Sequence, residues 1–151
     1  MDKKLKDSLS KIKLLICDID GVLTDGSFIK STSGEELRSF NALDGVGFVV
    51  LRLLDLNVKT AWITGRESLT TTQRAEELQI DDVYNGVIRK IDAYNELKKK
   101  YELSDSEVCF IGDDIIDIPI LEKVGFAVTV PNAPKYISCL LYTSPSPRDL
   151  P

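Results

Sequence analysis

Two aspartates, Asp18 and Asp20, follow an apolar run that ends in the segment CDIDGVLTDG, residues 17–26. Residues two apart on an extended strand point to the same side, so we expect both carboxylates together at the strand's carboxyl end. A carboxylate that faces a protein interior is costly unless it is paired or binds a metal. Gly21 permits a sharp exit of the backbone from the strand. The stretch predicts a cation site, although an Asp-rich turn after a strand is a common alternative.

A second acidic cluster follows another apolar run, residues 108–111, in the segment GDDIIDIP that contains Asp113, Asp114 and Asp117. Several carboxylates at one edge of a sheet would repel each other and destabilise the fold unless a divalent cation neutralises them. The chain contains no histidine, so oxygen atoms must supply the ligands. Oxygen-only ligands favour Mg²⁺.

A hydroxyl group and two cations complete the set of candidate site residues. Thr64 and Arg66 follow the apolar residues 61–63, and Lys90 opens a segment of helical period. Thr64 could donate to a phosphate oxygen, and Arg66 could pair with an anionic group of a substrate. The alternatives are that Thr64 caps the following helix and that both cations are solvated surface charges.

The elements that must position these side chains alternate between strand and helix. Apolar runs predict strands at 13–19, 59–63, 82–84 and 108–111, and helical periodicity predicts helices at 46–54, 68–78 and 91–101. This rhythm predicts an α/β, doubly wound fold: a mainly parallel sheet with helices on both faces. Ligand sites of such sheets lie at the carboxyl ends of the strands.

One segment breaks this rhythm directly after the first acidic cluster. Residues 27–30 and 36–40 flank a polar turn at 31–35, which predicts a β-hairpin. A hairpin at this point is either a flap over the site or an ordinary surface excursion.

The length, composition and charge of the chain limit the kinds of molecule that it is expected to bind. The 151 residues, 43% of them hydrophobic, suffice for one packed core. The net charge of −5 argues against a nucleic-acid surface, and no apolar stretch has the length of a membrane span. We expect a cytoplasmic protein because the first residues contain no apolar leader segment and the three cysteines lack disulfide or metal-site spacing. The expected partners are small molecules and cations.

In order and spacing, the motifs DIDGVLTDG, ITGR, Lys90 and GDDIID resemble those of the haloacid dehalogenase superfamily of phosphotransferases. The resemblance spans roughly residues 12 to 137 and extends, through FNALDGVGF, TGRES and GDDIIDIPILEKVG, to a capless branch of sugar-acid phosphatases. It implies a Mg²⁺-dependent phosphatase of lipopolysaccharide biosynthesis that assembles as a homotetramer. The implied substrate is 3-deoxy-D-manno-octulosonate 8-phosphate, with nonulosonate 9-phosphates as the alternative.

The resemblance also implies roles for the acids of the site. Asp18 would be the nucleophile that forms an aspartyl-phosphate, and Asp20 the general acid that then serves as the base activating water. Asp18 and Asp113 would bind Mg²⁺ through their carboxylates, and Asp20 through its backbone carbonyl. Asp114 and Asp117 would orient the site.

The remaining implied roles concern the substrate. Thr64 and Lys90 would hold the phosphoryl oxygens, and Arg66 would bind the substrate. Many members of the branch carry a basic residue where this chain has Leu43, so Arg66 and Arg38 would compensate in recognising the sugar-acid carboxylate.

The end of the chain departs from the family pattern. Relatives continue past the VPNAP region through a strand and a glycine-rich segment into a final helix, whereas this chain runs into CLLYTSPSPRDLP. We therefore expect a phosphatase domain at 1–137 and, at 138–151, an irregular non-native tail with helix or strand only in its first few positions.

Two other classes compete with the enzyme. A signalling receiver domain also groups acids, a threonine and a lysine around Mg²⁺, but it retains one phosphate per chain. A non-catalytic relative would bind Mg²⁺ without releasing phosphate. The acid pair spaced by one residue on the first strand fits the phosphatase better.

Overall fold

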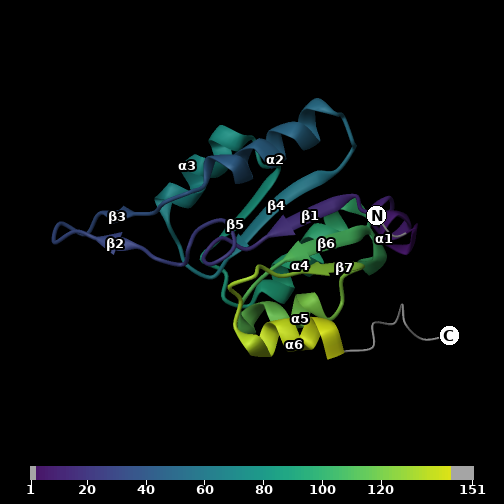
Figure 1. The fold of residues 1–151 in the computed structure, drawn as a ribbon. Coiled ribbons are helices and arrows are strands. Elements are labelled where there is room, and N and C mark those ends of the chain that lie inside the picture. The colour runs from purple at the N-terminus through teal and green to yellow at the C-terminus, as the bar shows by residue number, and fades with distance from the viewer. Residues whose placement is uncertain (1–2, 144–151) are drawn as a thin grey trace.

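The computed structural model describes residues 3–143, and its centre is a five-stranded sheet (Figure 1). All of its strands pair in parallel, in the order β5-β4-β1-β6-β7. The strands are β1 (Leu14–Cys17), β4 (Lys59–Thr64), β5 (Asp82–Asn85), β6 (Val108–Ile111) and β7 (Phe126–Val128). The parallel α/β sheet predicted from the apolar runs is confirmed.

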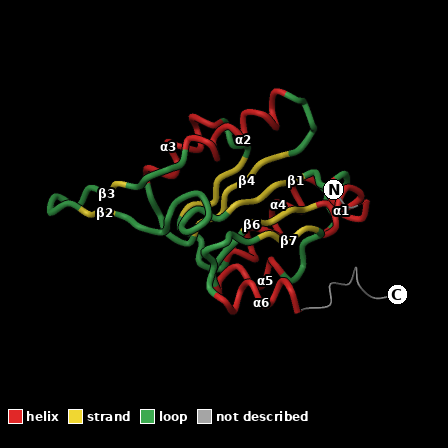
Figure 2. Tube along the Cα trace, in the orientation of Figure 1, coloured by secondary structure: helices red, strands yellow, loops and turns green. Residues whose placement is uncertain are grey.

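Helices cover both faces of this sheet. Figures 1 and 2 show α2 (Ala42–Leu53) and α3 (Leu69–Leu78) on one face, and α4 (Lys90–Tyr101), α5 (Ile118–Leu121) and α6 (Lys135–Thr143) on the other. Because side chains alternate along a strand, neighbouring residues of β4 enter different cores. Trp62 packs with Phe48 on the α2 side, whereas Ile63 packs with Leu97 on the α4 side.

The hairpin predicted after the first acidic cluster is present as β2 (Ile29–Lys30) and β3 (Glu36–Leu37), which pair antiparallel. It projects away from the sheet at the left of Figure 1. Its paired strands are shorter than the predicted 27–30 and 36–40.

The strand register explains why distant motifs meet. Cys17 of β1 lies beside Trp62 of β4 and beside Ile111 of β6. The residues that follow these three strand ends therefore lie at the same edge of the sheet. They include Asp18 after β1 and Asp113 after β6. This edge is the carboxyl end, where parallel sheets place their ligand sites.

The sequence did not predict α1 (Lys3–Leu9), α5 or β7, nor the two short 3₁₀ helices Asp105–Glu107 and Ile115–Asp117. In addition, α6 continues through Thr143, further into the expected irregular tail than a few positions. The reason is packing: Ile137 is fully buried, and Leu141, one turn later, packs against the same core. Residues 144–151 of that tail lie outside the described residues. Within 3–143, no helix combines the length and the apolar character that a membrane span requires.

Candidate active site

The centre of the site is a buried lysine held between two aspartates. Lys90 Nζ lies 2.7 Å from Oδ1 of Asp18 and 2.7 Å from Oδ1 of Asp117. Asp18 directly follows β1, Lys90 is the first residue of α4, and Asp117 ends a 3₁₀ helix (Ile115–Asp117) after β6. The side chains of Lys90 and Asp117 are fully buried, so the alternative of a solvated Lys90 is wrong. The structure thus joins three segments through one ammonium group.

Asp117 is fixed by its remaining oxygen. Its Oδ2 accepts hydrogen bonds from the backbone N–H groups of Asp113 and Asp114, at 3.0 and 3.1 Å. Gly112 is needed here because a Cβ atom at that position would lie 2.7 Å from Cγ of Asp117. Both oxygens of Asp117 are therefore occupied by protein donors, an arrangement that orients the loop after β6.

A third carboxylate, that of Asp113, lies beside this pair, and one of its oxygens is buried without a hydrogen-bonding partner in the part of the chain that the structure describes. Ligand oxygens of Asp18, Asp113 and Asp117 all lie within 4.8 Å of one another. Oδ1 of Asp113 is buried and receives no hydrogen bond from residues 3–143. An unpartnered buried carboxylate oxygen is costly, and a divalent cation between Asp113 and Asp18 would satisfy it. The residues present therefore fit a hard cation such as Mg²⁺.

Gly21 makes room for the Asp113 carboxylate. Its φ of +93° is a left-handed conformation that favours glycine. A Cβ atom at this position would overlap Oδ2 of Asp113 and lie 2.8 Å from Cγ. The turn after Asp20 therefore needs glycine for two reasons: the left-handed backbone conformation, and the space taken by the carboxylate of Asp113, a proposed metal ligand.

The electrostatics of the site also favour a cation. Burial raises the pKa of Asp18 to about 7, an effect that Lys90 only partly offsets and that Asp117 reinforces. Burial and the neighbouring carboxylates of Asp117 and Asp114 raise the pKa of Asp113 to about 6. Burial alone would lower the pKa of Lys90, but Asp18 and Asp117 raise it, so the ammonium stays charged. Carboxylates with raised pKa values gain free energy when a cation binds.

Asp20 follows Asp18 as predicted, but its carboxylate does not join the three clustered acids. Its Oδ1 lies 3.0 Å from Nη1 of Arg38, whose side chain is completely buried. Arg38 comes from the base of the hairpin, directly after β3. The expectation that the carboxylates of Asp18 and Asp20 lie together at one cation site is therefore wrong: among the described residues, Asp18 pairs with Lys90 and Asp20 with Arg38.

Thr64 and Arg66 lie at the carboxyl end of β4. Thr64 is fully buried, and Ser68 occupies the N-cap position of the helix that follows, so the interpretation of Thr64 as the helix cap is wrong. The guanidinium of Arg66 lies 3.7 Å from the centroid of the Phe28 ring and 3.7 Å from Oε2 of Glu36. The hairpin therefore binds the cation proposed to contact the substrate.

Asp114 points away from the clustered carboxylates. Its Oδ1 accepts hydrogen bonds from the backbone N–H of Ile115, at 2.6 Å, and from the hydroxyl of Tyr136 in α6, at 2.9 Å. It thus caps the 3₁₀ helix and connects α6 to the loop after β6.

Sequence reasoning missed Glu36 and treated Arg38 only as a compensating cation. Both residues point to the same side of an extended segment, and Nε of Arg38 donates to Oε1 of Glu36 at 3.0 Å. Opposite charges two residues apart in a strand-like segment were the available signal.

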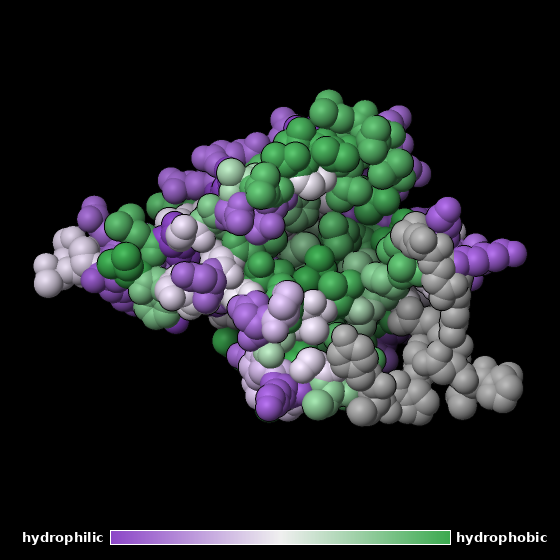
Figure 3. All heavy atoms as spheres, in the orientation of Figure 1, coloured by the Kyte–Doolittle hydropathy of each residue, from purple (hydrophilic) through white to green (hydrophobic). Residues whose placement is uncertain are grey.

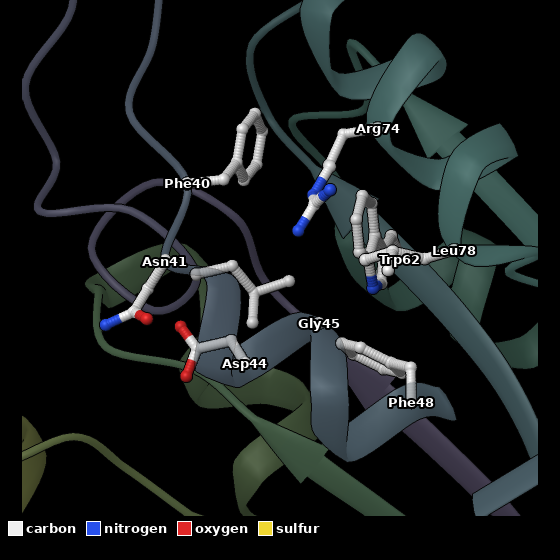
Figure 4. A pocket seen from close by; sticks show the side chains of 9 residues that line it. Phe40, Asn41, Asp44, Gly45, Phe48, Trp62, Arg74 and Leu78 are labelled. Atoms are coloured by element: carbon white, nitrogen blue, oxygen red, sulfur yellow. The ribbon is translucent and has the colours of Figure 1, made fainter. Parts of the chain in front are cut away.

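A small pocket lies apart from these acids, between α2, β4 and α3. Figure 4 shows Trp62, Phe48 and Phe40 around it, together with Asp44 and Arg74. The indole N–H of Trp62 is buried without a hydrogen-bonding partner among the described residues. No residue predicted for the site lines this pocket.

In this parallel sheet, acids follow two central strands, and a buried lysine bridges two of these acids. This is the arrangement that the resemblance to the haloacid dehalogenase superfamily predicts. The model of the haloacid dehalogenase-like hydrolase family matches residues 56–139, and the chain belongs to this family. It is similar to the 3-deoxy-D-manno-octulosonate 8-phosphate phosphatase KdsC of Yersinia pestis, with 42% identity over 124 residues. That match covers 82% of this chain and 65% of the relative, so the chain spans about two thirds of that protein's length.

Solved structures give the same neighbours. The crystal structure of the Yersinia pestis phosphatase matches with a TM-score of 0.86 and 36% identity, covering 91% of this chain and 74% of that one. The Moraxella catarrhalis phosphatase, solved with magnesium, phosphate and KDO, matches with a TM-score of 0.84 and 33% identity. Its match covers 89% of this chain and 76% of the other.

Proposed function

We propose that this chain is a Mg²⁺-dependent phosphatase that hydrolyses 3-deoxy-D-manno-octulosonate 8-phosphate in lipopolysaccharide biosynthesis. The observation that carries the proposal is the buried Asp18–Lys90–Asp117 cluster beside the unpartnered oxygen of Asp113. Further support comes from the Moraxella catarrhalis relative, whose structure contains magnesium, phosphate and the sugar acid KDO.

Asp18 and Asp113 would hold the metal through carboxylate oxygens, together with the backbone carbonyl of Asp20. When bound, Mg²⁺ would neutralise charge on the phosphoryl oxygens and so weaken their repulsion of an attacking carboxylate. The fit rests on the raised pKa values of Asp18 and Asp113 and on the absence of histidine from the chain.

The proposed reaction proceeds in two displacements. In the first, a carboxylate oxygen of Asp18 attacks phosphorus, the bond to the sugar oxygen breaks, and Asp20 donates a proton to that oxygen. In the second, Asp20 takes a proton from water, whose oxygen attacks phosphorus and releases phosphate and the Asp18 carboxylate. Lys90 and Thr64 would hold phosphoryl oxygens, because the loose transition state needs positioning and charge stabilisation.

Arg66 is the proposed contact for the sugar-acid carboxylate. Its guanidinium is partly exposed, and its ion contact with Glu36 is long, at 3.7 Å, so a substrate carboxylate would compete well for it. Leu43, where many relatives of the branch have a basic residue, is 76% exposed and adds no charge.

The test is Mg²⁺-dependent phosphate release from octulosonate 8-phosphate, compared with nonulosonate 9-phosphates and with reactions that contain EDTA. We expect many turnovers per chain, the largest kcat/KM with the octulosonate and no release with EDTA. Release of a single phosphate per chain would indicate a receiver-like domain. Mg²⁺ binding without any release would indicate a non-catalytic relative.

We also propose that the chain acts as a homotetramer. Figure 3 shows hydrophobic side chains gathered over α2 at the top of the molecule. On the outer face of α2, Leu43, Val46, Val50 and Leu53 are 42–76% exposed and recur at helical spacing. Ile29 and Leu37 of the hairpin are also exposed. Apolar surface of this extent supports an interface between copies of the chain.

A cytoplasmic location is part of the same proposal. Cys17 and Cys109 are buried free cysteines, and a reducing compartment would preserve such thiols. Fractionation of the expressing cells, with detection of the chain, would test this location.

A further inference from the structure

Arg38 has the least exposed side chain of any arginine for which an ion pair is recorded among the described residues, and it touches three different elements. Its side chain is 0% exposed. Nη1 lies 3.0 Å from Oδ1 of Asp20 and donates to Oγ1 of Thr71 in α3 at 3.2 Å, while Nε donates to Oε1 of Glu36. The guanidinium thus connects the loop after β1, the hairpin and α3.

The contact with Asp20 is an ion pair that lacks the geometry of a good hydrogen bond. Oδ1 of Asp20 and Nη2 of Arg38 are both buried and have no hydrogen-bonding partner among residues 3–143. Burying a guanidinium costs free energy that such an imperfect contact recovers poorly. The hydrogen bonds of Arg38 to Glu36 and Thr71 contribute to the fold, but the two buried atoms without partners call for a separate explanation, and a catalytic role is one of the known ones.

We propose that Arg38 is a positioning residue for Asp20, the general acid and base of the proposed function on which this inference rests. An ion pair at Oδ1 keeps Oδ2 available for the leaving oxygen of the substrate. The Asp20 side chain is 28% exposed, so without Arg38 it would be free to sample other rotamers. Proton transfer requires hydrogen-bond distance, so this restriction speeds the step.

Glu36 extends this arrangement to the substrate side. One of its oxygens binds Arg38, and the other lies 3.7 Å from Nη1 of Arg66. The proposed general acid, Asp20, and the proposed substrate-binding residue, Arg66, are therefore both held by residues at the base of the same hairpin. Displacement of the hairpin would shift both groups together.

The test compares two substrates with different leaving groups. Proton donation matters for octulosonate 8-phosphate, whose leaving group is an alkoxide, and much less for p-nitrophenyl phosphate, whose phenolate leaves unaided. Since kcat/KM reports the steps up to the departure of the leaving group, Arg38→Met should lower it about 100-fold for the sugar phosphate and about 3-fold or less for the aryl phosphate.

Further variants separate positioning from folding. Thr71→Val removes one anchor of Arg38 without touching Asp20 and should give the same substrate pattern with smaller losses. Arg38→Lys keeps a cation and should recover at least about 10-fold of the loss. The control is Arg52→Met, which removes a guanidinium hydrogen bond to the carbonyl of Leu78 and should leave both kcat/KM values unchanged.

Fluorescence of Trp62, the only tryptophan, checks that each variant is folded, because the Trp62 ring stacks on Phe40 just beyond Arg38. Equal losses with both substrates, or no loss with either, in an otherwise active protein would overturn the role of Arg38 alone. Absence of turnover by the unsubstituted chain would instead overturn the proposed function, and this inference with it.

Discussion

The ammonium of Lys90 lies 2.7 Å from Oδ1 of Asp18, although one residue opens helix α4 and the other follows strand β1. Both side chains are buried, so solvent and salt screen the attraction between them only weakly. Lys90 also pairs with Asp117, and among residues 3–143 it is the only cation that forms an ion pair with the three clustered carboxylates. The ammonium of Lys90 thus holds the proposed nucleophile, Asp18, in place and also stabilises the fold.

Replacement of Lys90 by methionine should destabilise the protein strongly. The variant leaves Asp18 and Asp117 buried without their cation, a change that costs about 3–5 kcal/mol. The loss should be larger at pH 8 than at pH 5, because burial raises the pKa of Asp18 to about 7, so this carboxyl group is protonated and uncharged at pH 5. Urea unfolding at both pH values measures the effect.

Lys13→Met is the matched control for this prediction. Lys13 pairs with Glu107 at 2.7 Å, but its side chain is 58% exposed. An exposed pair of this kind contributes about 1 kcal/mol or less. Equal losses of stability in the two variants would contradict the interpretation of Lys90 as the buried centre of the site.

Mg²⁺ should stabilise the protein more at high pH than at low pH. The pKa values of Asp18, about 7, and Asp113, about 6, lie above the ordinary value for aspartate, so the folded protein binds more protons than the unfolded chain between about pH 4 and 7. In the absence of metal, these two groups therefore lower stability as the pH rises through this range. Mg²⁺ needs the ionised carboxylates and offsets that loss.

Thermal unfolding with and without Mg²⁺ at pH 5.5 and pH 8 measures this coupling. We expect a clearly larger rise in Tm at pH 8. Asp113→Asn should remove most of the Mg²⁺ response at both pH values while stabilising the metal-free protein at pH 8. An equal Mg²⁺ effect at the two pH values would argue against a site formed by these acids.

Gly21→Ala should impair metal binding as well as stability. The added Cβ would overlap the Asp113 carboxylate and force it to move. Gly34→Ala is a close control because Gly34 has a similar φ, +91°, but no atom within 4 Å of the added Cβ. Both variants should lose about 1 kcal/mol from backbone strain.

Isothermal titration with Mg²⁺ distinguishes the two glycine variants. Only Gly21→Ala should bind Mg²⁺ more weakly, by about 10-fold or more, which is the order expected when the support of a metal ligand is lost. Unchanged Mg²⁺ affinity in folded Gly21→Ala would show that the position of Asp113 does not matter for the metal.

Leu53→Glu should disrupt assembly of the proposed tetramer. Leu53 is 75% exposed at the end of the apolar face of α2, and a charge there would be buried in an interface between copies. Sedimentation velocity should show a tetramer for the unsubstituted chain and smaller species for the variant. Leu9→Glu, on α1, should leave assembly unchanged, and a monomeric unsubstituted chain would refute the proposal.

Much of the site was predictable because its residues lie in short motifs directly after apolar strands. Asp18, Asp113 and the strands before them follow from local pattern, and the parallel arrangement brings them to one edge. The partner of Asp20 was not predictable. Its position beside Arg38 depends on how the hairpin folds back against Thr71 of α3, which is a tertiary contact between segments of unrelated sequence.

The missed elements have similarly physical causes. The strand β7 has three residues, which are too few to show a periodic pattern of apolar side chains. The helix α1 has only two apolar residues at helical spacing, Leu5 and Leu9, and its other residues are polar. The extension of α6 is stabilised by Ile137 and Leu141 in the core, a contact that composition does not reveal. The roles of individual site residues stay predictions until variants are measured.

The most direct measurement is the rate of Mg²⁺-dependent phosphate release by Asp18→Asn. The substitution keeps the shape of the side chain and removes the proposed nucleophile, so the rate should fall by at least about 10⁴-fold. Asp92→Asn, an exposed acid of α4 that pairs with Arg89, should keep the full rate. Substantial turnover by folded Asp18→Asn would contradict the account.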